Sequence, residues 1–335
     1  MKPILRLDNL SVDFSTELGT VQAVREIALS VNQGEILAIV GESGCGKTVL
    51  CKSVMKLLPR NAKLSGRVFV EGDELTHASE RKMQRLRGTL FSMLFQDPMT
   101  SLNPTIPVGK QIIEALLSHD AIRQADAEKR AIELLELVGI DHPEERMALQ
   151  PHFFSGGMRQ RCVLAIALAL KPKILFADEP TTALDVTVQA AVLDLLVEVQ
   201  KKTGITIVFI THDLGVVARI ADRVAVMYAG KIVEIGTAED IFYDPQHPYT
   251  WGLLRAHPSL AVQTGQLCGI PGIPPNLIEP PVGDAFASRN AFALAIDFQQ
   301  MPPMFPVSAT HSAATWLLDE RAPKIEPPMM IKRTF

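Results

Sequence analysis

The stretch Gly41–Thr48, "GESGCGKT", constrains the fold of this chain more than any other. It fits the pattern G-x-x-x-x-G-K-[ST], with the short apolar run "EILAIV" before it and "KTVLCKSVMKLL" after it. The apolar residues of the second run recur at helical spacing. A glycine-rich loop between a strand and a helix turns backbone N–H groups inward around an anion. The stretch therefore predicts a phosphate-binding loop in an α/β fold.

Each residue of this loop is a candidate for nucleotide binding. The set is Gly41, Glu42, Ser43, Gly44, Cys45, Gly46, Lys47 and Thr48. We expect Lys47 to reach the β- and γ-phosphates and the Thr48 hydroxyl to ligate Mg²⁺. Cys45 lies near a helix N-terminus and Lys47, so we expect a lowered thiol pKa and inactivation by thiol reagents that ATP prevents. The alternative is that Cys45 is a passive small residue.

Two later strands end in polar residues suited to phosphate chemistry. "ILFADEP" places Asp178 and Glu179 at the carboxyl end of a buried strand, where ligands bind in open α/β sheets. Asp178 suits the Mg²⁺ shell, and Glu179 suits polarising a water for in-line attack on the γ-phosphate. His212 ends "TIVFITH" and suits a hydrogen bond to the γ-phosphate or to that water. The helix between these strands predicts a doubly wound βαβ arrangement.

A second anion-binding loop is expected at "FSGGMRQR". Ser155 is suited to cap a helix that begins at Gly156 and Gly157, leaving backbone N–H groups exposed. A single nucleotide does not need two such loops on one chain. We therefore expect this one to complete the phosphate site of a partner chain.

Length and composition limit the remaining choices. The chain has 335 residues and a formal net charge of −4, which gives no electrostatic footprint for nucleic acid or anionic lipid. No run reaches the ~20 apolar residues that a membrane helix needs, so any membrane role is expected to be peripheral. We expect helices over about 96–161, a hairpin turning at Ala229–Gly230, and a change of composition at Pro258. The predicted domains are 1–257 and 258–335.

The ordered set "GESGCGKT", "FQDP", "SGGMRQR", "ILFADEP", "TALD" and "THD" resembles the ABC ATPases over about Leu5–Gly236. This resemblance implies a RecA-like core, an antiparallel β subdomain and a helical signature subdomain. It also implies a head-to-tail dimer with two Mg-ATP sandwiched between phosphate loops and opposing signature loops.

The resemblance assigns further residues by their motifs. Gln96 is similar to the glutamine that contacts Mg²⁺ and faces the membrane subunit, and Asp185 to the residue that communicates across the dimer. Phe14 is similar to an aromatic platform for adenine, the alternative being an ordinary inward strand residue. The signature residues that act on the partner's nucleotide are Ser155, Gly156, Gly157 and Met158.

Longer segments, such as "FQDPMTSLNP", "PHFFSGGMRQR", "HPYTWGLL" and "IPGIPPNL", resemble the ATP-binding subunits of oligopeptide and dipeptide importers. This implies a peripheral position on the cytoplasmic face of the membrane. The implied partners are a second homologous ATPase subunit, two permease subunits and, indirectly, an extracellular peptide-binding protein, with no nucleic acid. The alternatives are import of nickel or glutathione by the same machinery and, more remotely, a soluble ABC ATPase acting on nucleic acid or ribosomes.

The segment "VGDAFASRNAFALAIDFQQ" lies in an extension in which many of these relatives carry four cysteines that resemble iron–sulfur ligands. The matching positions here are Asp284, Asn290, Asp297 and Thr315, and none supplies a thiolate. We expect the extension to fold against the ATPase core. The aromatic residues expected to bury apolar area there are Phe286, Phe292, Phe298, Phe305 and Trp316.

Purified protein is expected to contain no iron, because a single cysteine in this part of the chain, Cys268, cannot hold a cluster. Iron and acid-labile sulfide assays on protein purified without oxygen test this expectation. Stoichiometric iron with sulfide would contradict it.

Overall fold

The computed structural model describes residues 3–95, 101–119, 122–181, 185–256 and 269–328. The chain forms two compact units. The first comprises Met1–Asn32, Ile36–His77 and Ile210–Phe335, and the second comprises Gln33–Glu35 and Ala78–Phe209. The predicted boundary between residues 257 and 258 lies outside the described residues and stays a prediction.

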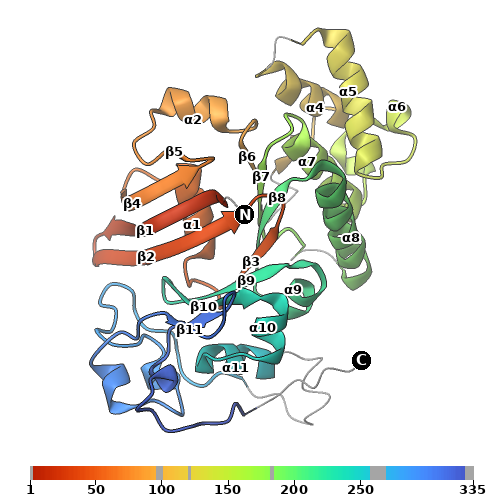
Figure 1. Cartoon of the computed structure of the whole chain (residues 1–335). Coiled ribbons are helices and arrows are strands. Elements are labelled where there is room, and N and C mark those ends of the chain that lie inside the picture. Colours follow the sequence, from red (N-terminus) through yellow and green to blue (C-terminus); the bar gives the residue numbers. More distant parts are fainter. Residues whose placement is uncertain (1–2, 96–100, 120–121, 182–184, 257–268, 329–335) are drawn as a thin grey trace. The chain divides into compact units, whose positions relative to one another are not determined.

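The first unit opens with an antiparallel sheet in the order β2-β1-β4-β5 (Figure 1). Its strands are β1 (Pro3–Thr16), β2 (Gly19–Asn32), β4 (Ala62–Val70) and β5 (Asp73–Glu74). Apolar side chains that alternate along β1, such as Leu5, Leu7 and Val12, are buried, as expected for a strand with one face on a core. The expected antiparallel element at the start of the chain is confirmed.

A second group of strands in this unit carries the loop before the first helix. β3 (Ile36–Val40) is buried throughout and pairs in parallel with β9 (Arg223–Tyr228), which pairs antiparallel with β10 (Lys231–Thr237). The turn between β9 and β10 has left-handed backbone at Ala229 and Gly230, with φ of 47° and 81°. This is the expected hairpin turn. The helices of the unit are α1 (Lys47–Val54), α9 (Leu214–Ile220), α10 (Ala238–Tyr243) and α11 (Pro248–Arg255).

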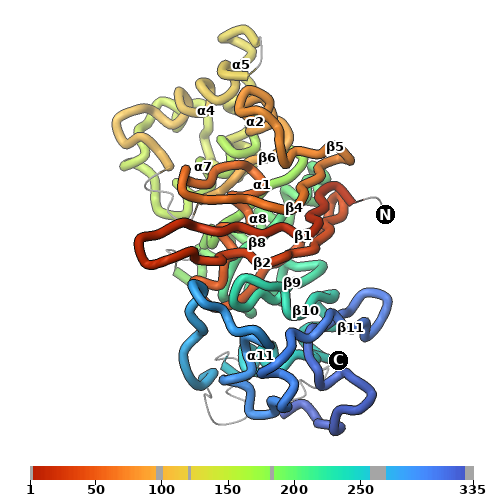
Figure 2. Tube along the Cα trace, turned by 90° about the vertical axis from the view of Figure 1, so that its left-hand side faces the viewer, coloured from red at the N-terminus to blue at the C-terminus, as the bar shows by residue number. Residues whose placement is uncertain are grey.

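The extension packs within the first unit, beside β10 and α11 (Figure 2). It contains the 3₁₀ turns η2 (Ala287–Arg289), η3 (Ala295–Phe298) and η4 (Trp316–Leu318), and the short strands β11 (Phe305–Pro306) and β12 (Ser312–Ala313). β12 pairs antiparallel with β10. The extension therefore continues a sheet of the first unit, which agrees with the expectation that it folds against the core.

A buried carboxylate fastens this junction. Glu234 of β10 is 0% exposed and accepts hydrogen bonds from the backbone N–H groups of Gln246 and His247, at 2.7 and 3.0 Å. Its third partner is Nε2 of His311, in the extension, at 2.8 Å. Burial lowers the pKa of His311, but the hydrogen bond and charge of Glu234, with the charges of Asp240 and Asp244, raise it above its ordinary value. The contact between His311 and Glu234 joins the extension to β10 and to the segment before α11.

The expected burial of aromatic residues is correct for one residue and wrong for another. Phe286 is buried in a cluster with Tyr228 and Tyr249. Phe298 is 60% exposed, because η3 turns its neighbour Asp297 inward instead. Phe292, Phe305 and Trp316 are half-buried.

The second unit contains the expected βαβ pattern. Its strands are β6 (Phe91–Leu94), β7 (Ile174–Asp178) and β8 (Thr206–Thr211, whose last two residues belong to the first unit), in the order β8-β7-β6. Its helices are α2 (Glu80–Leu86), α4 (Val108–Leu117), α5 (Gln124–Leu137), α6 (Pro143–Arg146), α7 (Gly156–Leu168) and α8 (Val186–Thr203), with the 3₁₀ turn η1 (Pro151–Phe153). Gly139 follows α5 with a φ of 70°, the left-handed backbone expected after a helix end.

Among the helices in the described ranges, none combines the length and the apolar character needed to cross a membrane.

The four polar residues that the resemblance matches to cysteine positions are all buried. Each accepts a hydrogen bond from a nearby backbone N–H in its own turn. The pairs are Asp284 with Phe286, Asn290 with Phe292, Asp297 with Leu294, and Thr315 with Leu317. Side chain to backbone bonds of this kind stabilise turns. Within the described parts of the chain, no group of three or more His, Cys, Asp or Glu side chains is arranged to hold a metal ion.

Asp284 makes stability depend on pH. Burial, with a contribution from Asp297, raises its pKa to about 6. An unfolded Asp titrates near pH 4, so the folded state bears a buried charge above about pH 6 and none below about pH 4. The contribution of Asp284 to stability therefore falls as pH rises through this window.

Replacing Asp284 by Asn keeps an acceptor for the Phe286 N–H and removes the charge. We take the free energy of unfolding of Asp284→Asn minus that of the unsubstituted protein. This difference is expected to rise by about 2 kcal/mol between pH 4 and pH 7.5. Urea unfolding at several pH values measures the difference. Asp319→Asn is the control, because Arg321 lowers the pKa of Asp319. The same difference in the free energy of unfolding, taken for Asp319→Asn, should fall as pH rises. A difference for Asp284→Asn that does not change with pH would contradict the expectation.

Candidate functional site

The loop between β3 and α1 is pressed against two neighbouring backbones of the first unit. A Cβ on Gly41 would lie 2.1 Å from the carbonyl oxygen of Met227, and one on Gly46 would lie 2.3 Å from that of Ala23. Gly41 and Gly46 also have φ of 156° and 106°. Only glycine can both lie this close to a neighbouring carbonyl oxygen and adopt a positive φ without strain. Ser43 and Gly44, by contrast, are exposed at the crest of the loop.

Lys47 is the charged residue at the base of this loop. It begins α1 and is only 6% exposed. Its Nζ donates to the carbonyl oxygens of Gly41 and Glu42 at 2.7 and 2.9 Å. A buried ammonium group held by neutral carbonyls is suited to an anionic ligand. The geometry of the loop thus fits the phosphates of a nucleotide.

The expectation of a lowered pKa at Cys45 is wrong, and its reaction with thiol reagents stays a prediction. Its thiol is 5% exposed, and burial raises its pKa despite the nearby Lys47 ammonium. The pattern alone could not show that the loop turns this side chain inward. The interpretation of Cys45 as a small packing residue fits the structure.

Further candidates lie in the first unit. Thr48 follows Lys47 in α1 and is half-buried. Phe14 is half-buried in β1, where it pairs with Val21 of β2 and Ala62 of β4. His212 directly follows β8 and is exposed, as expected of a residue at a strand end. The adenine role of Phe14 and the phosphate role of His212 stay predictions.

The acidic pair of the second unit lies where the sequence predicts. Asp178 is the last residue of β7 and is buried, and Glu179 follows it. Glu179 has a φ of 46°, a left-handed conformation that costs a non-glycine residue roughly 1–3 kcal/mol. Strain of this kind is common at functional sites. No feature of the sequence pattern indicates this conformation.

The signature loop is also in the second unit. Ser155 caps α7, with its Oγ accepting from the Met158 N–H at 3.3 Å, as expected. A Cβ on Gly157 would lie 2.4 Å from Val188 Cγ1 on α8, so a larger residue there would have to displace that side chain. Ser155 and Gly156 are exposed, so the start of α7 is open to a ligand from outside the chain.

Asp185 has a local structural role beside its predicted one. It caps α8, with Oδ1 accepting from the Val188 N–H at 2.9 Å, and is exposed. Exposed apolar side chains flank these two helix starts, at Phe153 and Val186. Gln96 lies outside the described residues.

The predicted residues thus fall into two groups. The phosphate loop, Phe14 and His212 belong to the first unit, while Asp178, Glu179, the signature loop and Asp185 belong to the second. Two residues that contact the phosphate loop are not predicted from the sequence. They are Tyr249, whose hydroxyl accepts from the Glu42 N–H at 2.7 Å, and Arg289 of the extension. Tyr249 lies in "HPYTWGLL" and Arg289 in "VGDAFASRNAFALAIDFQQ", but neither segment indicates a contact with the phosphate loop.

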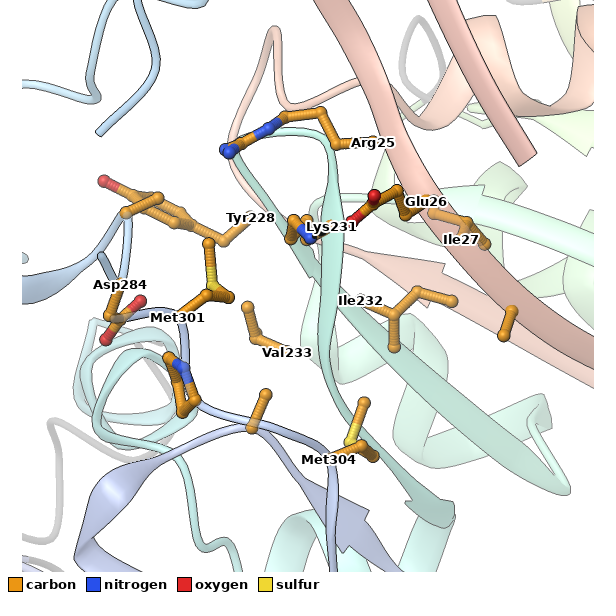
Figure 3. Close-up of a pocket in the computed structure, with 14 residues that line it drawn as sticks. Arg25, Glu26, Ile27, Tyr228, Lys231, Ile232, Val233, Asp284, Met301 and Met304 are labelled. Carbon is orange, nitrogen blue, oxygen red and sulfur yellow. Dashed lines mark hydrogen bonds and ion pairs between the residues drawn. The ribbon is translucent and has the colours of Figure 1, made fainter. Parts of the chain in front are cut away.

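A cavity of about 230 Å³ lies in the first unit, apart from the phosphate loop (Figure 3). Tyr228, Asp284 and Met301 lie on one side of it, and Glu26 and Lys231 lie on the other. Its walls come from β2, the hairpin of β9 and β10, and the extension. The extension thus meets the core around a partly open space as well as through direct contacts.

Two family models match the chain. The model described as "ABC transporter" matches residues 24–182, and the model described as "Oligopeptide/dipeptide transporter, C-terminal region" matches residues 233–296. The first match contains the phosphate loop, the signature loop and the β7 strand end. The second contains Arg289.

Similar proteins cover nearly the whole chain. The oligopeptide transport ATP-binding protein OppD of Bacillus subtilis (strain 168) is 56% identical over 98% of this chain and 93% of that protein. The dipeptide transport ATP-binding protein DppD of Lactococcus lactis subsp. cremoris (strain MG1363) is 55% identical over 97% of this chain and 93% of that protein.

Solved structures support the fold. The structure of cbiO1 from Clostridium perfringens, part of the ABC transporter complex cbiONQ, has a TM-score of 0.64 and 30% identity, covering 72% of this chain and 91% of that one. The dimeric structure of MJ0796, a bacterial ABC transporter cassette, has a TM-score of 0.62 and 25% identity, covering 70% of this chain and 98% of that one. The chain therefore belongs to the ABC transporter family, among the ATP-binding subunits that carry the oligopeptide/dipeptide transporter C-terminal region.

Proposed function

We propose that this chain binds ATP at Gly41–Thr48 and hydrolyses it to drive the import of oligopeptides or dipeptides. The observation that carries the proposal is the buried Lys47 ammonium at the base of a loop that only glycine can form. The start of α1 adds backbone N–H groups and the positive end of a helix to this cation. Together they supply the charge and the donors that a triphosphate needs.

The peptide cargo is supported by the relatives. OppD and DppD are named for oligopeptide and dipeptide transport, and their similarity runs through the extension as well as the ATPase core. The ATPase core is shared with cbiO1, a part of the ABC transporter complex cbiONQ that is not named for peptides, so the match in the extension is the more specific support for peptides.

The residue roles follow from the chemistry of phosphoryl transfer. Thr48, Asp178 and Gln96 have oxygen atoms suited to Mg²⁺, which when bound neutralises charge on the β- and γ-phosphates. Lys47 binds these phosphates, and Glu179 orients a water and accepts its proton during attack. His212 donates a hydrogen bond that depends on the γ-phosphate. Phe14 stacks on the adenine ring.

A partner ATPase subunit completes each site in this proposal. The start of α7, which is exposed at Ser155 and Gly156, offers backbone N–H groups to a nucleotide held by the partner. The exposed apolar residues Phe153 and Val186, with Asp185, form part of the contact surface. We expect a heterodimer with a homologous subunit, bound at the cytoplasmic face of the membrane to two permease subunits that receive peptide from an extracellular binding protein.

Opening and closing of this dimer couples hydrolysis to transport. ATP favours the closed dimer, because the signature loop contacts the γ-phosphate only in that state. Loss of the γ-phosphate removes the contact and the dimer opens. The segment after Gln96 transmits this motion to the permeases as a rigid-body movement.

Glu179→Gln is expected to retain ATP binding and to lower the rate of hydrolysis by at least about 100-fold, because an amide does not accept the proton of the attacking water. Phosphate release by the assembled transporter and nucleotide binding by the purified chain give the two measurements. Lys47→Ala is the matched variant, which should lose nucleotide binding itself. Hydrolysis by Glu179→Gln at the wild-type rate would exclude Glu179 from this role.

A further inference from the structure

The extension holds the first turn of the phosphate loop through one ion pair. Arg289 Nη1 and Nη2 donate to Oε2 and Oε1 of Glu42 at 2.6 and 2.9 Å. The side chain of Arg289 is 3% exposed and that of Glu42 is 27% exposed. Such a two-pronged pair, largely shielded from water, is among the stronger polar contacts in proteins.

Arg289 is itself fixed in place by the extension and the core. Its Nε donates to the carbonyl oxygen of Pro271 at 2.7 Å, and Nη1 also donates to the Tyr228 hydroxyl at 3.1 Å. Its guanidinium lies 5.7 Å from the ring centroid of Tyr228 and 5.8 Å from that of Phe286. The hydrogen bonds with Glu42 are the main reason that its pKa is raised. The cation therefore has little freedom to leave Glu42.

Glu42 is held at three points. Its carboxylate is bound by Arg289, its backbone N–H donates to the Tyr249 hydroxyl, and its carbonyl oxygen accepts from Lys47 Nζ. The contact with Lys47 joins this turn directly to the residue expected to bind phosphate. A shift of Glu42 would thus also move the carbonyl oxygen that accepts the hydrogen bond from Lys47 Nζ.

We propose that Arg289 is a positioning residue for nucleotide binding, acting through Glu42. This inference rests on the proposed function of Gly41–Thr48. ATP brings several negative charges to this loop, and the Glu42 carboxylate would repel them if it were neither neutralised nor held. Arg289 does both, so the extension forms part of the nucleotide site.

A purely structural role for Arg289 leads to a different result. If Arg289 only attached the extension to the core, its loss would weaken folding, and a neutral residue at position 42 would not restore ATP binding. If Arg289 acts by controlling the Glu42 charge, a neutral residue at position 42 should compensate for its loss. The two single variants and the double variant form a cycle that separates these cases.

The experiment measures the binding of a fluorescent ATP analogue with Mg²⁺ to the purified full chain. We expect Arg289→Met to raise the Kd about tenfold, and the double variant with Glu42→Gln to recover at least about threefold of that loss. The Kd of Glu42→Gln alone completes the cycle. In the assembled transporter, Arg289→Met should raise KM for ATP while kcat changes by less than about threefold. Arg321→Met is the control. It removes another two-pronged Arg–Asp pair from the extension, that of Arg321 with Asp319, and should leave the Kd unchanged.

A wild-type Kd for Arg289→Met would overturn the proposal, as would a double variant that binds no better than Arg289→Met. If Arg289→Met does not unfold cooperatively, Arg289→Lys replaces it. An ammonium group does not hold both carboxylate oxygens in this geometry, so we expect about threefold weaker binding, and a wild-type Kd would overturn the proposal.

The Lys47→Ala variant distinguishes failure of this proposal from failure of the proposed function. Wild-type binding by Lys47→Ala would contradict the assignment of the phosphate loop itself. Loss of binding by Lys47→Ala, together with a wild-type Kd for Arg289→Met, would overturn the role of Arg289 alone.

Discussion

The close approach of the loop at Gly41 and Gly46 to the backbones of Met227 and Ala23 is the constraint on which the site depends. Any side chain at either glycine would push the loop off β9 or β2. Because the loop lies this close to the two strands, Lys47 is buried at its base and donates inward to Gly41 and Glu42. The same constraint turns the Cys45 thiol inward and leaves Ser43 and Gly44 exposed at the crest.

The extension belongs to this arrangement physically. Its strand β12 pairs with β10, and the buried Glu234 joins His311 of the extension to the core. Phe286 packs against Tyr228 and Tyr249, and Tyr249 accepts the Glu42 N–H. One continuous set of contacts thus leads from the turns around Asp284 to the phosphate loop. The four buried polar residues satisfy their own turns by hydrogen bonds, so these turns have internal support from the protein alone.

The sequence predicts what depends on neighbours along the chain. The strand–loop–helix at Gly41–Thr48, the strand end at Asp178 and the Ser155 cap are local patterns, and all are found where expected. Contacts between distant residues are not predictable in this way. Tyr249 and Arg289 lie 207 and 247 residues from Glu42 in the sequence. The errors at Cys45 and Phe298 have the same origin, because burial is decided by packing partners that spacing does not reveal.

Hydrogen–deuterium exchange of the full chain, with and without Mg-ATP, tests most directly the claim that the loop and the extension form one nucleotide site. We expect ATP to slow exchange in peptides covering residues 41–48 and 284–290 at the same half-saturating concentration. We also expect the effect on 284–290 to be lost in Arg289→Met. Slowed exchange confined to 41–48 in the wild-type chain would contradict the role of the extension, and unchanged exchange in both peptides would contradict the nucleotide site itself.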